Sequence, residues 1–140
     1  MSCFVRERHI RFADCDPAGI VFYPQYFVMF NGLVEDWIEQ RLGIPYRELV
    51  LGRRIGLPTV RLEADFKAVS VLRDAVALSL RVERLGQRSL TLQLHCTGPA
   101  DDVRMSLRQV IVTTSLATHQ SIDIPDDLRI GIDRFVAATH

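Results

Sequence analysis

The 140-residue sequence has almost no lysine: Lys67 is the only one, and the other sixteen basic residues are arginines. Seventeen acidic residues balance them, so the net charge is zero and no overall field draws the chain to nucleic acid or to a membrane. The forked guanidinium group of arginine makes bidentate contacts with phosphate groups, although a codon bias of the source genome would give the same composition. The charge balance therefore favours neither nucleic acid nor a membrane as a partner.

Paired cysteines and long apolar runs are also missing. Cys3, Cys15 and Cys96 are odd in number and widely spaced, which favours free thiols in a reducing compartment. The four histidines show no spacing that would indicate a zinc site. The charged N-terminus, MSCFVRERHI, does not look like a secretory signal, and no apolar run is long enough to span a membrane. We expect a cytoplasmic protein.

One long amphipathic helix is predicted from about Pro24 to Arg41. Pro24 suits the first turn, where its missing N–H costs nothing, and Gly43 suits the stop. The apolar side chains recur at helical spacing: Phe27, Phe30, Leu33, Val34, Trp37 and Ile38. A strand is predicted before this helix at residues 4–12, and a short amphipathic helix near the end at residues 124–136.

Between these helices the apolar residues alternate with a period of two, which predicts four half-buried strands at about 60–68, 75–85, 89–97 and 103–114. Turns at 86–89 and 98–102 join them as antiparallel hairpins. In the first of these strands, one face carries Val60, Leu62, Ala64 and Phe66. The last strand ends in VIVTT, apolar on both faces, so its outer face needs a cover such as a second subunit.

The order of these elements predicts the fold. We find no repeat or linker, so residues 1–140 are expected to form a single domain. A strand, a long helix and four further strands give an α+β arrangement. A five-stranded antiparallel sheet wrapped around one long central helix is the hot-dog fold.

The stretch RFADCDPAGIVFYPQYF, residues 11–27, carries the chemistry. Asp14 and Asp16 lie in the loop before the long helix, where unpaired backbone N–H groups and the helix dipole favour an oxyanion. A carboxylate there can act as a general base or as a nucleophile toward an acyl group. A helix cap and an Asp-Pro turn would explain the same residues. Cys15 alternates with the two aspartates and is expected to face packing, and no further ligand completes a metal site.

The segment DCDPAGIVFYPQYF closely resembles the active-site motif of the 4-hydroxybenzoyl-CoA thioesterase family. The pattern matches nearly completely over fourteen residues, and GLPTVRLEADF and ERLGQRSLTL extend the resemblance more weakly along the chain. The resemblance implies a hot-dog acyl-CoA thioesterase. It makes Asp16 the catalytic carboxylate, places the oxyanion-binding backbone N–H at Tyr23, and gives Asp14 a bracing role. Gly19 would let the loop approach the substrate.

The resemblance also implies an assembly and a substrate. Members place their active sites at a dimer interface, and dimers pair into tetramers; no metal or organic cofactor is implied, because coenzyme A is part of the substrate. Arg88 matches a basic position that holds CoA phosphates, although a solvated arginine beside a turn is equally compatible. The helix position that meets the aromatic hydroxyl is acidic in the family and is Asn31 here. The acyl group is therefore either aromatic or a short to medium aliphatic chain.

Two other functions fit the same fold. A non-hydrolytic module that binds acyl thioesters would not need Asp16, since fold alone does not fix function. A hydratase would need a histidine near the helix start, and the nearest one is His9. Retention of Asp16 argues against the binding module, and the lack of a histidine at the helix start argues against the hydratase.

Overall fold

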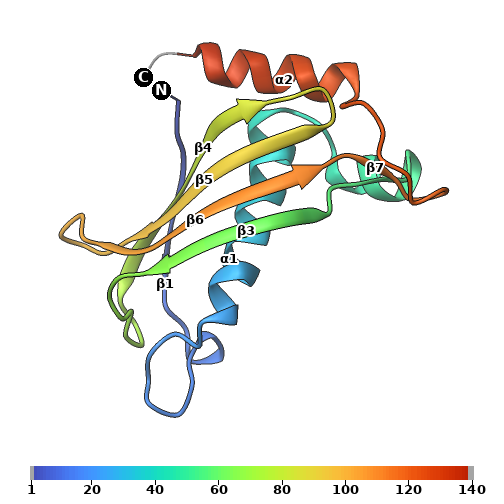
Figure 1. The fold of residues 1–140 in the computed structure, drawn as a ribbon. Helices are drawn as coiled ribbons and strands as arrows, with labels where there is room; N and C mark the ends of the chain where they lie inside the picture. Colours follow the sequence, from blue (N-terminus) through green and yellow to red (C-terminus); the bar gives the residue numbers. More distant parts are fainter. Residues whose placement is uncertain (1, 139–140) are drawn as a thin grey trace.

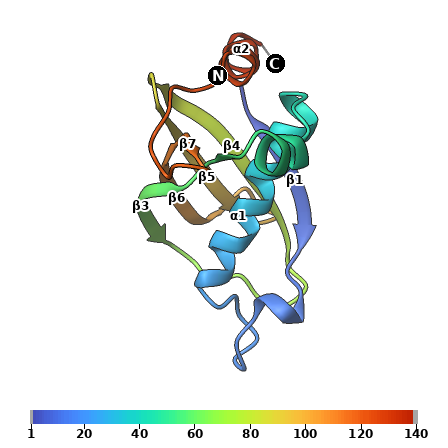
Figure 2. The ribbon, with the colours of Figure 1, turned by 90° about the vertical axis from the view of Figure 1, so that its right-hand side faces the viewer.

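In the computed structural model, which describes residues 2–138, an antiparallel five-stranded sheet curves around one long helix (Figures 1 and 2). The strands lie in the order β1 (Phe4–His9), β4 (Ala75–Leu85), β5 (Ser89–Thr97), β6 (Val103–Val112) and β3 (Thr59–Phe66). The predicted hot-dog fold is confirmed. The predicted strand at residues 4–12 ends early, because a 3₁₀ turn, η1, occupies Phe12–Asp14.

The central helix has the predicted length. Helix α1 spans Pro24–Asp36 and continues as a wider π-helical turn, η2, over Trp37–Arg41; Gly43 follows with a φ of +73°. The side chains that α1 and η2 bury against the sheet are Tyr26, Met29, Phe30, Leu33, Val34, Trp37 and Ile38.

The C-terminal helix closes one end of the core. Helix α2, Asp126–Ala137, buries Leu128, Ile132 and Phe135. The Phe135 ring meets the fully buried Trp37 ring edge-on, with centroids 5.4 Å apart. Figure 1 shows α2 across the end of the sheet, at the opposite end from the loop that precedes α1. Within residues 2–138, no helix combines the length and apolarity that a membrane span requires.

Residues 45–56 form structure that the sequence patterns did not predict. A π-helical turn, η3, spans Glu48–Gly52, and strand β2 (Ile55–Gly56) pairs with β7 (Thr114–Ser115) as a small second sheet. Such short elements offer too few residues for a periodic pattern.

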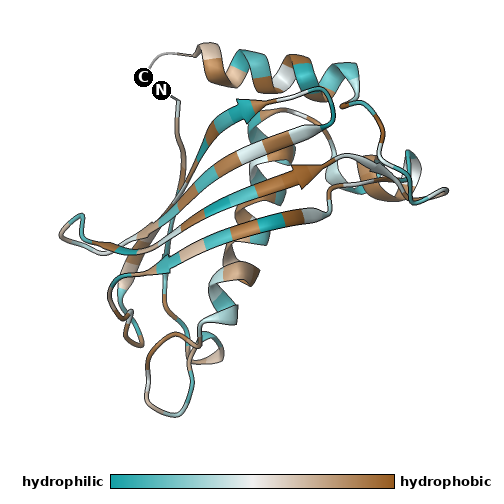
Figure 3. Ribbon diagram, in the orientation of Figure 1, coloured by the Kyte–Doolittle hydropathy of each residue, from teal (hydrophilic) through white to brown (hydrophobic). Residues whose placement is uncertain are grey.

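Strand β3 is much more exposed than its alternating pattern predicted. The exposed fractions of Val60, Leu62 and Phe66 are 61%, 45% and 51%, and only Ala64 on that face packs against the core. The reason is position: β3 is an edge strand that pairs with β6 on one side only. Figure 3 shows hydrophobic residues alternating with hydrophilic ones along β3. Val110 and Val112 on β6, for which a cover was predicted, are half-buried.

Candidate active site

Residues 14–22 form a small hairpin, here called the site hairpin, which leads directly into α1. The Phe22 N–H donates to the Asp14 carbonyl (2.9 Å), and the Asp16 N–H donates to the Ile20 carbonyl (3.0 Å). Gly19 has a φ of +77°, and a Cβ there would meet nothing within 4 Å. Glycine is therefore favoured by the left-handed backbone and not by crowding within the chain.

Asp16 presents one unpaired carboxylate oxygen. Its Oδ1 accepts the Ala18 N–H (2.8 Å), which fixes the side chain in a tight turn. Within residues 2–138, Oδ2 has no hydrogen-bond or ion-pair partner, and Asp16 is half-buried. A carboxylate held at one oxygen and open at the other can remove a proton from water or attack an electrophilic carbon.

The Tyr23 backbone amide is the second open group. It has no acceptor within the described part of the chain, and Pro24, the next residue, supplies no N–H. Because α1 begins at Pro24, the positive end of the helix dipole lies here. An unpaired N–H in that field is suited to polarising a carbonyl oxygen. The Tyr23 side chain is 58% exposed.

Asp14 is placed differently from Asp16. It is buried, and its Oδ2 accepts both the Arg11 N–H (2.8 Å) and the Arg8 guanidinium. These are the contacts of a residue that braces the loop, as predicted.

Cys15 packs against the hydrophobic core, as predicted, and its Sγ lies 3.4 Å from the Arg11 carbonyl. Burial, followed by the nearby charges of Asp14 and Asp16, raises the pKa of the Cys15 thiol. A raised pKa lowers the thiolate fraction, which argues against a nucleophilic role for this cysteine.

An aromatic hollow of about 310 Å³ adjoins Tyr23. The Phe66 ring lies 6.0 Å from the Tyr23 ring and 6.1 Å from the Tyr26 ring, measured between centroids. Val21 and residues 67–70 complete the lining. Neither Tyr26 nor Phe66 was predicted as a site residue: Phe66 had the spacing of an ordinary core position, and Tyr26 was not among the apolar positions of the predicted helix. Only the contact between α1 and the end of β3 reveals the hollow.

Arg88 and Asn31 lie away from Asp16 in the single chain. Figure 1 shows the β4–β5 turn, which carries Arg88, at the far end of the sheet from the site hairpin. The eleven residues of β4 separate the two, or about 35 Å of strand. Arg88 also pairs there with Asp123 (2.9 Å). Asn31 lies on the exposed face of α1, about 12 Å along the helix from Tyr23.

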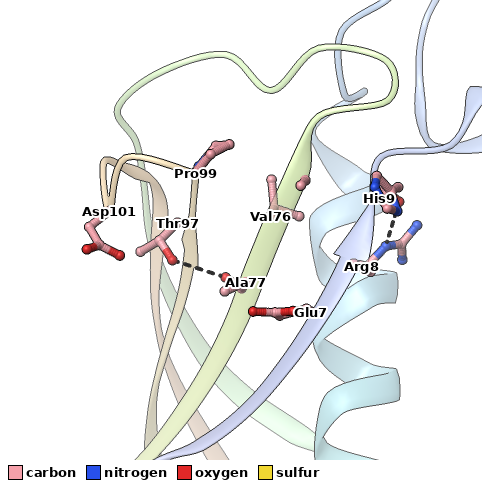
Figure 4. A pocket seen from close by; sticks show the side chains of 10 residues that line it. Glu7, Arg8, His9, Val76, Ala77, Thr97, Pro99 and Asp101 are labelled. Atoms are coloured by element: carbon pink, nitrogen blue, oxygen red, sulfur yellow. Dashed lines mark hydrogen bonds between the residues drawn. The ribbon is translucent and has the colours of Figure 1, made fainter.

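A separate hollow of about 310 Å³ lies between β1, β4 and the end of β5 (Figure 4). The Thr97 hydroxyl there donates to the Ala77 carbonyl (3.4 Å). Within residues 2–138, none of the site residues predicted from the sequence lines this hollow. The polar side chains that do so are Glu7, Arg8, His9, Thr97 and Asp101.

Comparisons with known proteins show which family the fold and sequence resemble. Residues 10–132 match the family described as the thioesterase-like superfamily. A 4-hydroxybenzoyl-CoA thioesterase of Pseudomonas sp. (strain CBS-3) is 27% identical over 129 residues, covering 86% of this chain and 91% of the relative. A 1,4-dihydroxy-2-naphthoyl-CoA hydrolase of Prochlorococcus marinus (strain MIT 9303) is 29% identical over 144 residues, covering 95% and 89%. A solved gentisyl-coenzyme A thioesterase is 28% identical with a TM-score of 0.82, covering 92% of this chain and 99% of that one.

Proposed function

The chain belongs to the thioesterase-like superfamily and is a thioester hydrolase, and from this premise we propose that it hydrolyses aromatic acyl-CoA thioesters with Asp16 as the catalytic carboxylate. Water and the thioester yield a carboxylic acid and free coenzyme A. Asp16 Oδ2 either removes a proton from the attacking water or attacks the carbonyl carbon to form an anhydride that water then cleaves. The Tyr23 N–H donates to the thioester oxygen as negative charge develops on it.

The observation that carries the proposal is the presence of two open groups, one in the site hairpin and one at the residue that follows it. Asp16 has a carboxylate oxygen without a partner, and the Tyr23 amide has no acceptor, within the described chain. The other carboxylate of the site hairpin, Asp14, is buried and paired with the Arg8 guanidinium. A loop built only as a helix cap would direct a carboxylate oxygen to the first N–H groups of α1, but no side chain caps that helix.

An aromatic acyl group fits the same surroundings. The hollow beside Tyr23 is lined by aromatic rings, which bind another ring by edge and offset contacts. The three relatives described above are named for hydroxylated aromatic acyl groups. We therefore assign the acyl group to the hollow formed by Tyr23, Tyr26 and Phe66.

The proposal includes a dimer that pairs further into a tetramer. Arg88 is too far from Asp16 to serve the same site within one chain, so its predicted contact with CoA phosphates requires a partner subunit. Asn31, on the exposed face of α1, and Gly19, at the hairpin tip, would contact substrate from that shared site.

Replacement of Asp16 by asparagine tests the mechanism. Asparagine Oδ1 can still accept the Ala18 N–H, so Asp16→Asn preserves the turn and removes only the open carboxylate oxygen. We expect kcat to fall by roughly 10³-fold or more while CoA-ester binding persists. Thiol release would be measured with 4-hydroxybenzoyl-, benzoyl-, phenylacetyl- and aliphatic CoA esters.

The matched control is Asp65→Asn, which makes the same change at an exposed position on β3. Near-wild-type turnover by Asp16→Asn would show that Asp16 is not the catalytic carboxylate. Binding without thiol release by the wild-type protein would instead favour a non-hydrolytic acyl-thioester module.

A further inference from the structure

The site hairpin is hydrogen-bonded along one side to residues 67–74, here called the support loop. The Val21 N–H donates to the Ser70 carbonyl (2.9 Å), and the Leu72 N–H donates to the Gly19 carbonyl (2.9 Å). Ile20 pairs with Val71 between them. The Tyr23 amide, two residues after Val21, and Asp16, three residues before Gly19, therefore take their positions from the support loop.

The support loop is in turn held by Arg104 on β6. The Arg104 guanidinium donates from Nη1 to the Val69 carbonyl (3.0 Å) and to Asp74 Oδ2 (2.9 Å). The Arg104 carbonyl accepts the N–H groups of Lys67 (2.9 Å) and Ala68 (3.1 Å). One residue thus contacts the loop at its beginning, middle and end. Only 12% of the Arg104 side chain is exposed.

Two carboxylates fix the guanidinium. Nε of Arg104 donates to Asp102 in the β5–β6 turn, while Asp74 also accepts the Val71 N–H (2.8 Å). The Val71 N–H and Arg104 together lower the pKa of the Asp74 carboxyl, so this carboxylate stays ionised at neutral pH. Charge-assisted bonds of this kind are shorter and stronger than neutral ones, and Arg104 makes them on two sides.

Arg104 also reaches the base of the aromatic hollow. Ser70 is 1% exposed, and its Oγ lies 3.4 Å from Arg104 Nη1 and 3.0 Å from the Tyr26 hydroxyl. Tyr26 belongs to the first turn of α1. The guanidinium is therefore linked both to the hairpin that carries Asp16 and to the start of the helix that follows Tyr23.

We infer that Arg104 is a positioning residue, which sets the place of the Asp16 carboxylate and the Tyr23 amide through the support loop. The inference rests on the proposed function. A shift of about 1 Å in such groups costs on the order of 100-fold in rate, without loss of the surfaces that bind substrate. Removal of Arg104 should consequently act on kcat far more than on KM.

The test compares Arg104→Met with Arg108→Met. Both residues lie on β6 and pair with two carboxylates, but Arg108 binds Glu83 and Glu63 and has no bond to the support loop within residues 2–138. With 4-hydroxybenzoyl-CoA as the probe, we expect Arg104→Met to lower kcat about 10- to 100-fold with KM changed less than threefold. Arg108→Met should stay within twofold of wild type. Arg104→Lys, which keeps the charge but replaces the guanidinium fork with a single nitrogen, should fall between.

Backbone amide exchange gives a readout that does not depend on activity. In Arg104→Met, the backbone amides of residues 14–22 and 67–74 should lose their protection against exchange before those of the five-stranded sheet do. In Arg108→Met, the protection of these two segments should stay as in the wild type. A kcat equal to that of Arg108→Met, or unchanged protection of the site hairpin, would overturn the inference. If the wild-type protein cleaves no CoA ester, the proposed function fails, and exchange alone decides the role of Arg104. If Arg104→Met does not fold, Arg104→Lys decides by the same two measurements.

Discussion

Two aspartates that are two residues apart have opposite surroundings. Asp14 is 8% exposed and its Oδ2 is bound by Arg8 and by a backbone N–H, whereas Asp16 is half-buried and has no cationic partner within the described chain. Their chemistry follows from these contacts, because a carboxylate that is buried and ion-paired is less available to a substrate than one without a cationic partner. The residue type alone could not separate them, whereas the resemblance of the motif to a known family predicts a different role for each.

Asp14→Asn should therefore act on stability more than on rate. An asparagine oxygen can take the place of Oδ2, but asparagine is uncharged, so the Arg8 guanidinium loses its ion-pair partner. We expect a loss of about 1–3 kcal/mol in the free energy of unfolding, measured by urea denaturation, and a fall in kcat of less than tenfold. Asp65→Asn again provides the control. A variant with intact stability but a loss of kcat like that of Asp16→Asn would mean that the two roles are reversed.

At the scale of elements, the helices and strands with a regular apolar spacing could be predicted from the sequence. The 3.6-residue spacing from Phe27 to Ile38 predicted the central helix, and the alternation in residues 75–114 predicted three strands with their turns. Arg104 was not predicted, because its partners Val69 and Asp74 are 35 and 30 residues away and no local pattern links them. The aromatic hollow was missed for the same reason: it forms only where α1 meets the edge of the sheet.

The β4–β5 turn tests how coenzyme A is held. Arg88 is 54% exposed and its guanidinium also binds Asp123, so a phosphate would compete with a carboxylate for it. We expect Arg88→Ala to raise KM for a CoA ester by up to about tenfold and to leave KM for the matching pantetheine ester unchanged, because only the first carries the nucleotide phosphates. The control is Arg134→Ala on α2, also exposed. Equal effects on both esters would remove Arg88 from phosphate binding.

At the scale of the whole molecule, the two edges of the sheet differ. The inner face of β1 carries Arg6 and Arg8, charges that discourage another strand from pairing there. The same face of β3 carries Val60, Leu62 and Phe66, all about half exposed or more, along an edge that has no partner within the described chain. An unpaired edge with exposed apolar side chains is a surface for another strand. A second copy related by a two-fold axis would pair β3 with itself in antiparallel fashion.

Leu62→Lys tests this interface at the middle of β3. A lysine on the apolar side of the edge would have to be desolvated in a dimer, so we expect the mass in solution to fall from twice 15.9 kDa or more toward 15.9 kDa. Light scattering after gel filtration measures it, and Ile130→Lys, at an exposed position on α2, is the matched control. Because Phe66 on the same strand borders the aromatic hollow, thiol release should fall together with the mass. An unchanged mass for Leu62→Lys would place the interface elsewhere, and a fully active monomer would show that each chain holds a complete site.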